Sequence, residues 1–112
     1  MTVDITQFCP VARTLDIVGD RWTILILRDL IIEGPRKFQD FQRAFPRISP
    51  NTLSARLKTL EQHGIVERRT YEEHPPRAEY VLTEKGRELR PVLRTLRLWG
   101  EKYTKSPSSP KA

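Results

Sequence analysis

One helix in the middle of the chain has sharply marked ends, and it constrains the fold more than any other segment. Ser49 followed by Pro50 marks its start, because a serine hydroxyl caps the first turn and proline suits the first helical position. Gly64 suits the position just past its end. Between them, one apolar stripe repeats at helical spacing: Leu53, Leu57 and Leu60. The helix is therefore expected to bury one face and leave the other free.

The free face carries small and polar side chains. At 100° per residue, the side opposite the leucines holds Asn51, Ala55, Lys58, Thr59 and Gln62, with Thr52 and Ser54 beside it. Side chains of these types can meet base edges or phosphates. The alternative is an ordinary solvent-exposed helix of a small α+β domain.

The hydrophobic pattern changes period directly after this helix. Residues 65–71 are rich in β-forming side chains, and residues 78–82 alternate between the two faces of a strand. The charged, proline-containing segment 72–77 between them is predicted to be the loop at the tip of a hairpin.

Three helices are predicted ahead of the marked helix. The first starts at Pro10 and is closed by Gly19, and the second, capped by Asp20, is apolar on nearly every side. The third covers residues 37–45 and places its phenylalanines at core spacing: Phe38, Phe41 and Phe45.

After the hairpin, Thr83 can cap a last helix, which Pro91 should kink or divide because proline removes a backbone hydrogen bond. We expect a folded domain over residues 1–104 and, from its Ser, Pro and Lys content, a disordered tail over residues 105–112. Helix, short link, helix and two-stranded hairpin is the element order of a winged helix-turn-helix. The predicted fold class is α+β, mainly helical, with a β-hairpin wing and dimerisation helices at both ends.

The basic residues are concentrated near the marked helix. The chain has a net charge of +6, yet residues 1–35 are net acidic, whereas residues 36–58 hold six basic side chains and one acidic one. Clustered cations bind phosphates and release counterions, which favours double-stranded DNA as a partner. The alternative is a solvated surface with uneven charge.

Several motifs together resemble one known family. They are Cys9-Pro10, Gly19-Asp20-Arg21-Trp22-Thr23, Gly34-Pro35-Arg36-Lys37-Phe38, Ile48-Ser49-Pro50, Leu53-Ser54-Ala55-Arg56-Leu57, Gly64-Ile65-Val66, Pro76-Arg77 and Leu82-Thr83-Glu84-Lys85-Gly86. Over about residues 8–100, the chain resembles the HxlR-type transcriptional regulators of bacteria, which are MarR-like in fold. The resemblance implies a cytoplasmic, sequence-specific DNA-binding regulator that dimerises through its terminal helices.

The same resemblance assigns the DNA contacts. The recognition helix maps to residues 49–63, and the wing to residues 72–77. The implied DNA-binding residues are Arg36, Lys37, Ser49, Asn51, Thr52, Ala55, Arg56, Lys58, Arg68 and Arg77. Asn51, Thr52, Ala55 and Lys58 would approach bases, and Arg36, Lys37 and Arg56 would hold the backbone. Arg77 would contact the minor groove or a phosphate, supported by Arg68 or Arg69. Two glutamates at the wing tip, Glu72 and Glu73, oppose strong wing contacts.

Cys9 is the single cysteine, so the chain can form no internal disulfide, and a reducing compartment is expected. At the start of the first helix, with Arg13 one turn on, its thiolate would be favoured. The alternative is a small apolar residue packed near the N-terminus. The resemblance implies a sensor of oxidants or electrophiles, acting through a second subunit, a mixed disulfide or alkylation.

An apolar stripe on the last helix, with part of the first, is predicted to form a homodimer interface that presents two recognition helices to a palindromic operator. Its residues are Val11, Leu15, Leu89, Val92, Leu93, Leu96, Trp99 and Tyr103. The alternative is that the last helix folds over the first within one chain.

Other function classes have less support. The longest aliphatic run, residues 24–27, is far shorter than the roughly 20 residues of a membrane span. No metal-ligand spacing, phosphate loop or nucleophile arrangement indicates an enzyme, and no cofactor or metal is expected. A winged-helix module that binds only protein, and a regulator that responds to a small-molecule effector rather than to oxidation, remain the alternatives.

Overall fold

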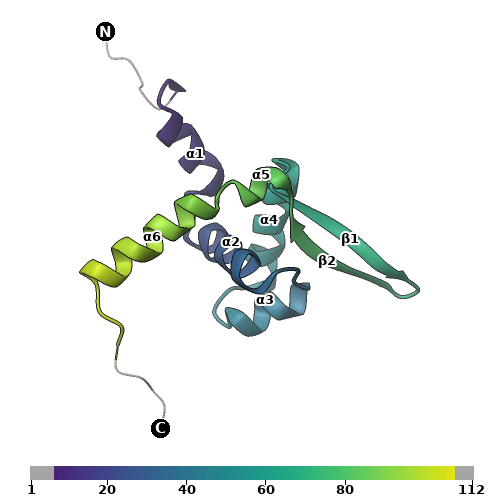
Figure 1. Cartoon of the computed structure of the whole chain (residues 1–112). Coiled ribbons are helices and arrows are strands. Elements are labelled where there is room, and N and C mark those ends of the chain that lie inside the picture. Colours follow the sequence, from purple (N-terminus) through teal and green to yellow (C-terminus); the bar gives the residue numbers. More distant parts are fainter. Residues whose placement is uncertain (1–6, 108–112) are drawn as a thin grey trace.

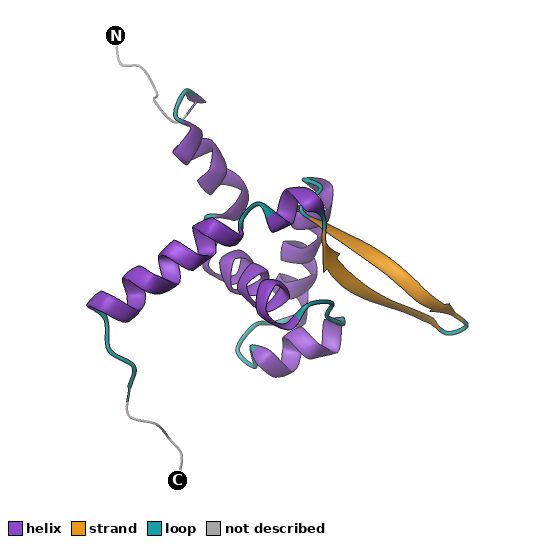
Figure 2. Ribbon diagram, in the orientation of Figure 1, coloured by secondary structure: helices purple, strands orange, loops and turns teal. Residues whose placement is uncertain are grey.

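The computed structural model describes residues 7–107, except for the side chain of Pro76. Its elements follow the predicted order (Figures 1 and 2). They are α1 (Pro10–Val18), α2 (Arg21–Glu33), α3 (Phe38–Ala44), α4 (Pro50–Gln62), β1 (Val66–Glu73), β2 (Pro76–Leu82), α5 (Glu84–Arg87) and α6 (Arg90–Tyr103). The mixed, mainly helical fold with a two-stranded antiparallel sheet confirms the predicted class.

The core lies between α2, α3 and α4 and is closed by the roots of the two strands. The side chains with the least exposure come from all three helices and from β1: Ile26, Leu27, Phe41, Leu53, Leu57, Leu60 and Val66. Phe38 and Phe45 pack against this cluster, so the predicted phenylalanine stripe of α3 does face the core. The leucine stripe of α4 is likewise buried, which confirms the predicted buried face of that helix.

Helix α4 has the ends that its sequence predicts. The Ser49 hydroxyl oxygen accepts a hydrogen bond from the Thr52 backbone N–H at 3.1 Å. At the other end, Gly64 has a φ of +69°, a left-handed conformation that favours glycine. This turn lets the Ile65 N–H donate back to the Leu60 carbonyl at 2.9 Å, and Ile65 itself is buried. Both ends of α4 are therefore fixed, and its orientation is set by the core.

The hairpin is longer than predicted. Residues 72–77 were expected to form a loop, but β1 continues to Glu73, β2 starts at Pro76, and the connection between them is residues 74–75. Glu72 faces Arg77 across the strands, and their side chains form an ion pair at 3.1 Å. Proline is tolerated at the first residue of a strand, so Pro76 does not end the pairing. Glu72, Glu73 and Arg77 therefore belong to the paired strands rather than to a loop.

Arg36 connects the hairpin to the helical body. Its backbone pairs with that of Tyr80 on β2, with hydrogen bonds of 3.0 and 2.7 Å. Its guanidinium Nε donates to the Asp29 carboxylate of α2 at 2.8 Å. The segment before α3 therefore holds β2 and α2 together.

The C-terminal part divides at Pro91, as expected. The Thr83 hydroxyl caps the short helix α5, and α6 begins at Arg90 with proline in its first turn. Helices α1 and α6 extend from the body on the side opposite the hairpin (Figure 1). The predicted disordered tail lies largely outside the described residues. Among residues 7–107, no helix is both long and apolar enough to cross a membrane.

Candidate nucleic-acid interface

The outer face of α4 is open to solvent, as its sequence pattern predicts. Asn51, Ala55 and Lys58 are exposed, whereas Thr52 is half-buried. The Ser49 hydroxyl donates to the Thr52 hydroxyl oxygen at 2.8 Å, so these two predicted contact residues are paired with each other at the start of the helix. In the described part of the chain, Lys58 takes part in no ion pair. The face therefore presents an amide, a methyl and a free ammonium on one rigid helix.

Arg56 lies at the flank of α4, as expected, and is tied to α2. Its Nε donates to the Asp20 carboxylate at 2.9 Å, and the same oxygen caps α2 by accepting from the Thr23 N–H at 3.1 Å. Desolvation opposes ionisation of Asp20, but the Thr23 hydrogen bond and the Arg56 charge outweigh it and hold the pKa of this carboxyl below its ordinary value. Arg56 and Asp20 thus join α4 to the start of α2.

Arg36, predicted to contact the DNA backbone, forms an ion pair with Asp29 inside the protein. Asp29 is buried, and the hydrogen bond that it accepts from Arg36 raises the pKa of the guanidinium. The Arg36 side chain is only 23% exposed. A buried carboxylate needs such a partner, because an unpaired buried charge is strongly unfavourable. The pair accounts for Arg36 without a phosphate.

Three other exposed cations lie on the elements before and after α4 in the chain. Lys37, the N-cap of α3, is exposed, and its Nζ lies 5.3 Å from the centroid of the Tyr71 ring. Arg68 on β1 and Arg47 in the link between α3 and α4 are also exposed. No ion pair involves any of these three among residues 7–107. Their charge is not neutralised by a carboxylate in this part of the chain.

The wing tip is net acidic, because Glu72 pairs with Arg77 whereas the exposed Glu73 takes part in no ion pair among residues 7–107. Arg77, the predicted wing contact, is held by Glu72, and Arg69 lies 3.7 Å from Glu67. The Glu72–Arg77 pair is consistent with the expectation that Glu72 weakens DNA contacts of the wing, because a paired guanidinium attracts phosphate less strongly than a free one. The hairpin projects far beyond the helical body (Figure 1).

Comparison with known proteins identifies the family. The model of the HxlR-like helix-turn-helix family matches residues 17–108. The chain belongs to the HxlR-like helix-turn-helix family. The expected family membership is confirmed, and the protein is a helix-turn-helix transcriptional regulator. Members of the family are regulators rather than enzymes, which agrees with the expectation from the motifs.

Individual relatives support the same placement. The chain is 43% identical over 95 residues to the HTH-type transcriptional regulator YdeP of Bacillus subtilis, covering 85% of this chain and 73% of that protein. Among solved structures, the redox regulator HypR in its oxidized form is similar with a TM-score of 0.80 and 39% identity, covering 88% of this chain and all of that one. The reduced form of the transcriptional regulator YodB from B. subtilis is similar with a TM-score of 0.69 and 34% identity, covering 85% of this chain and 93% of that one.

Cys9 lies where the sequence predicts, at the N-cap of α1, and is half-buried. The Arg13 backbone N–H donates to the Cys9 carbonyl at 3.0 Å, closing the first turn. The Arg13 guanidinium donates to the Gln7 carbonyl at 3.0 Å, so it is engaged by the backbone that precedes the helix.

The predicted interface residues divide into two groups. Val11 and Leu15 on α1 are highly exposed, so α6 does not cover α1 within the chain, as one alternative required. Four residues of α6 are also exposed: Val92, Leu96, Trp99 and Tyr103. Leu89 differs, because it packs against the core, and Leu93 is half-buried.

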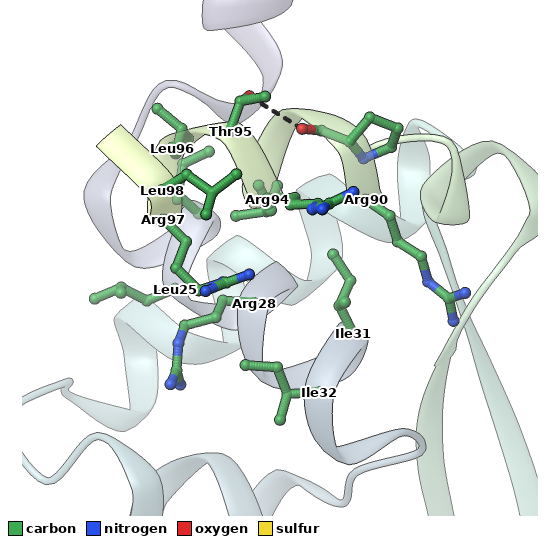
Figure 3. Close-up of a pocket in the computed structure, with 13 residues that line it drawn as sticks. Leu25, Arg28, Ile31, Ile32, Arg90, Arg94, Thr95, Leu96, Arg97 and Leu98 are labelled. Atoms are coloured by element: carbon green, nitrogen blue, oxygen red, sulfur yellow. Dashed lines mark hydrogen bonds between the residues drawn. The ribbon is translucent and has the colours of Figure 1, made fainter. Parts of the chain in front are cut away.

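A groove of about 820 Å³ separates α6 from α2 (Figure 3). Its apolar walls include Leu25 and Ile31 from α2 and Leu93 from α6. Four arginines lie around these side chains: Arg28, Arg90, Arg94 and Arg97. No acidic residue lines the groove among those that the structure describes.

Two residues near the interface are absent from the predicted set. Arg47 belongs to the basic cluster and could have been included on charge alone. Tyr71 reads as an ordinary β-forming residue, and only the three-dimensional pairing brings it to Lys37.

Proposed function

We propose that this regulator binds a palindromic operator as a homodimer, with α4 of each subunit in the major groove. The observation that carries the proposal is the division of α4 into a fully buried leucine face and an exposed face with Asn51, Ala55 and Lys58. A major groove about 12 Å wide accepts one helix. A helix held rigidly by its buried face can place these side chains at base edges.

The surrounding cations would contact the DNA backbone. Lys37 and Arg68 are free to do so, and Arg47 joins them by position. Arg56 uses only Nε for Asp20, and its remaining donors can meet a phosphate. We assign Arg36 to the support of the hairpin rather than to DNA, and Arg77 to a weak contact in which phosphate competes with Glu72.

Selection of bound duplexes from random DNA tests the proposal. Enrichment of two inverted half-sites about one helical turn apart is expected. On the selected duplex, Lys58→Ala should weaken binding roughly ten-fold and lower the salt dependence. Lys105→Ala, exposed beyond α6, is the matched control. Unchanged affinity in Lys58→Ala would remove α4 from the DNA surface, and an absence of salt-dependent binding would favour a module that binds only protein.

A second copy of the chain would cover the exposed apolar residues of α1 and α6. Monomers rarely leave such a large apolar surface in water, and a two-fold axis would place two α4 helices on one face of the DNA. A monomeric mass in sedimentation at micromolar concentration would contradict this assembly.

We further propose that Cys9 controls DNA binding, in the cytoplasm, by oxidation or alkylation. Support comes from its place at the α1 N-cap and from the similarity to HypR, whose name states redox regulation. With a single cysteine, the modified form is a disulfide to the partner subunit, a mixed disulfide or an alkyl adduct. Diamide or a quinone should release DNA from the wild type but not from Cys9→Ser, and release from both would end this proposal.

The groove between α2 and α6 favours one second candidate, control by a small-molecule effector. Its apolar walls and four arginines suit an apolar carboxylate. Benzoate and octanoate are suitable probes, with Arg94→Gln as the variant. A shift in thermal unfolding that is present in the wild type and lost in the variant would support an effector site, and no shift at millimolar probe would exclude these acids.

A further inference from the structure

Tyr71 occupies an irregular position in the wing. Thr70 pairs with Ala78 and Glu72 pairs with Arg77, so Tyr71 is the extra residue of a β-bulge. A bulge bends its strand and redirects the side chain at that point. The Tyr71 ring therefore need not follow the alternation of the other residues of β1.

The redirected ring lies against Lys37. The Lys37 Nζ is 5.3 Å from the centroid of the ring, within the roughly 6 Å of a cation–π contact. The Lys37 backbone is fixed as well, because its N–H donates to the Asp40 carboxylate at 2.9 Å. Lys37 is thus held at its backbone by α3 and at its ammonium by the wing.

The other connections between the helical body and the hairpin lie near the hairpin root. There the Arg36 backbone pairs with that of Tyr80, the Phe41 ring of α3 lies 6.3 Å from the Tyr80 ring, and Val66 is buried in the core. A long hairpin fixed only at its root can bend beyond it, whereas an attachment nearer the tip limits its direction. Tyr71 supplies such an attachment.

We propose that Tyr71 is a positioning residue for DNA binding: its ring holds the Lys37 ammonium at the start of α3 and sets the direction of the wing. The inference rests on the proposed DNA-binding function. An ammonium has three N–H donors, and stacking on one ring leaves others for a phosphate. Tyr71 itself does not contact DNA in this scheme, so its effect passes through Lys37.

The test uses the full-length protein and a duplex selected by the wild type from random DNA. Tyr71→Leu should weaken binding roughly two- to five-fold, the range of an exposed cation–π contact. It should also lower the salt slope, by less than the roughly 0.9 expected for Lys37→Ala, because the Lys37 charge remains but is no longer held in place. The double variant should bind no more weakly than Lys37→Ala alone. Tyr71→Phe, the matched control, keeps the ring and should bind like the wild type.

Each departure has a defined meaning. Wild-type affinity in Tyr71→Leu, or additive losses in the double variant, overturns the proposal. Weak binding by Tyr71→Phe overturns it too, since it would show that the hydroxyl acts directly. If Tyr71→Leu does not fold, Tyr71→Trp replaces it, and its binding should equal or exceed that of the wild type because tryptophan gives the strongest cation–π contact. Failure of the wild type to select any duplex would instead contradict the proposed function.

Discussion

The helices at the centre of the molecule and those at its ends use the same kind of sequence pattern with different results. In α4, the apolar stripe is fully buried against α2 and α3. In α6, an equally clear stripe has no buried residue at all, and in α1 only Val18 is buried. An amphipathic pattern therefore predicts a helix, but not whether its own chain will cover it.

The difference indicates which parts of the fold are complete in one chain. The helices α2, α3 and α4 at the centre bury most of their apolar residues and pair the buried carboxylate Asp29 within the chain, although Ile32 on α2 is 54% exposed. The terminal helices leave Trp99 and Leu15 exposed by 63% and 57%. We infer that the stability of the centre belongs to the single chain, whereas that of the ends depends on a second one.

The largest effect should come from the central unit. Leu57 is 1% exposed, and Leu57→Ala should lower the free energy of unfolding by about 2–5 kcal/mol because it leaves a cavity in the core. Denaturation in urea measures this loss, which should be independent of protein concentration. Leu96→Ala on α6 is the comparison, and its loss should appear only at concentrations where a dimer forms. If both variants lost the same unfolding free energy at every protein concentration, α6 would be stabilised within the single chain, as the central helices are.

The next effect concerns the ends. Trp99→Gln keeps a side chain suited to a helix but removes the large apolar ring, so the variant should sediment as a monomer at micromolar concentration with an unchanged circular dichroism spectrum. Its affinity for a two-site duplex should fall by about 100-fold or more, since the two half-sites are no longer bound together. Lys105→Gln is the control. A dimeric Trp99→Gln would place the interface elsewhere.

The central unit could be predicted from sequence because its signals are local. Ser49, Pro50 and Gly64 fix the ends of α4 through backbone rules that hold in any fold, and Pro91 divides the last helix for the same reason. The exposed face of α4 follows from its helical period. These features need no knowledge of which segments pack together.

The remaining features depend on pairing over longer distances. Arg36 is tied to Asp29 on the preceding helix, and Tyr71 is turned by a bulge. Leu89 continues the stripe of α6 in sequence, yet it lies before that helix and packs on the core. The segment 72–77 pairs as strand because Glu72 and Arg77 meet across the hairpin. The prolines and charges of this segment predicted a loop, whereas the structure has paired strand residues there.

A smaller effect tests how α4 is attached to α2. Asp20 has two roles, because it caps α2 through the Thr23 N–H and pairs with Arg56 of α4. Asp20→Ala removes both and should destabilise the protein by about 1–2 kcal/mol in urea denaturation. Asp20→Asn keeps a cap acceptor and loses only the charge, so its cost should be about 0.2–1 kcal/mol. Equal costs would show that the cap has no part in the effect.

The smallest effect is the pH dependence of that same pair. Because the pKa of Asp20 is lowered from its ordinary value of 3.8, the unfolded chain takes up its proton first as the pH falls. The stabilisation is therefore complete above the ordinary pKa and is lost as the pH falls through the lower pKa of the folded state. The difference in unfolding free energy between wild type and Asp20→Asn should be constant above about pH 5 and shrink below it. Asp16→Asn, on the exposed side of α1, controls for the loss of one carboxylate. A difference that stays constant down to pH 2 would show that the ionised carboxylate of Asp20 does not hold α4 to α2.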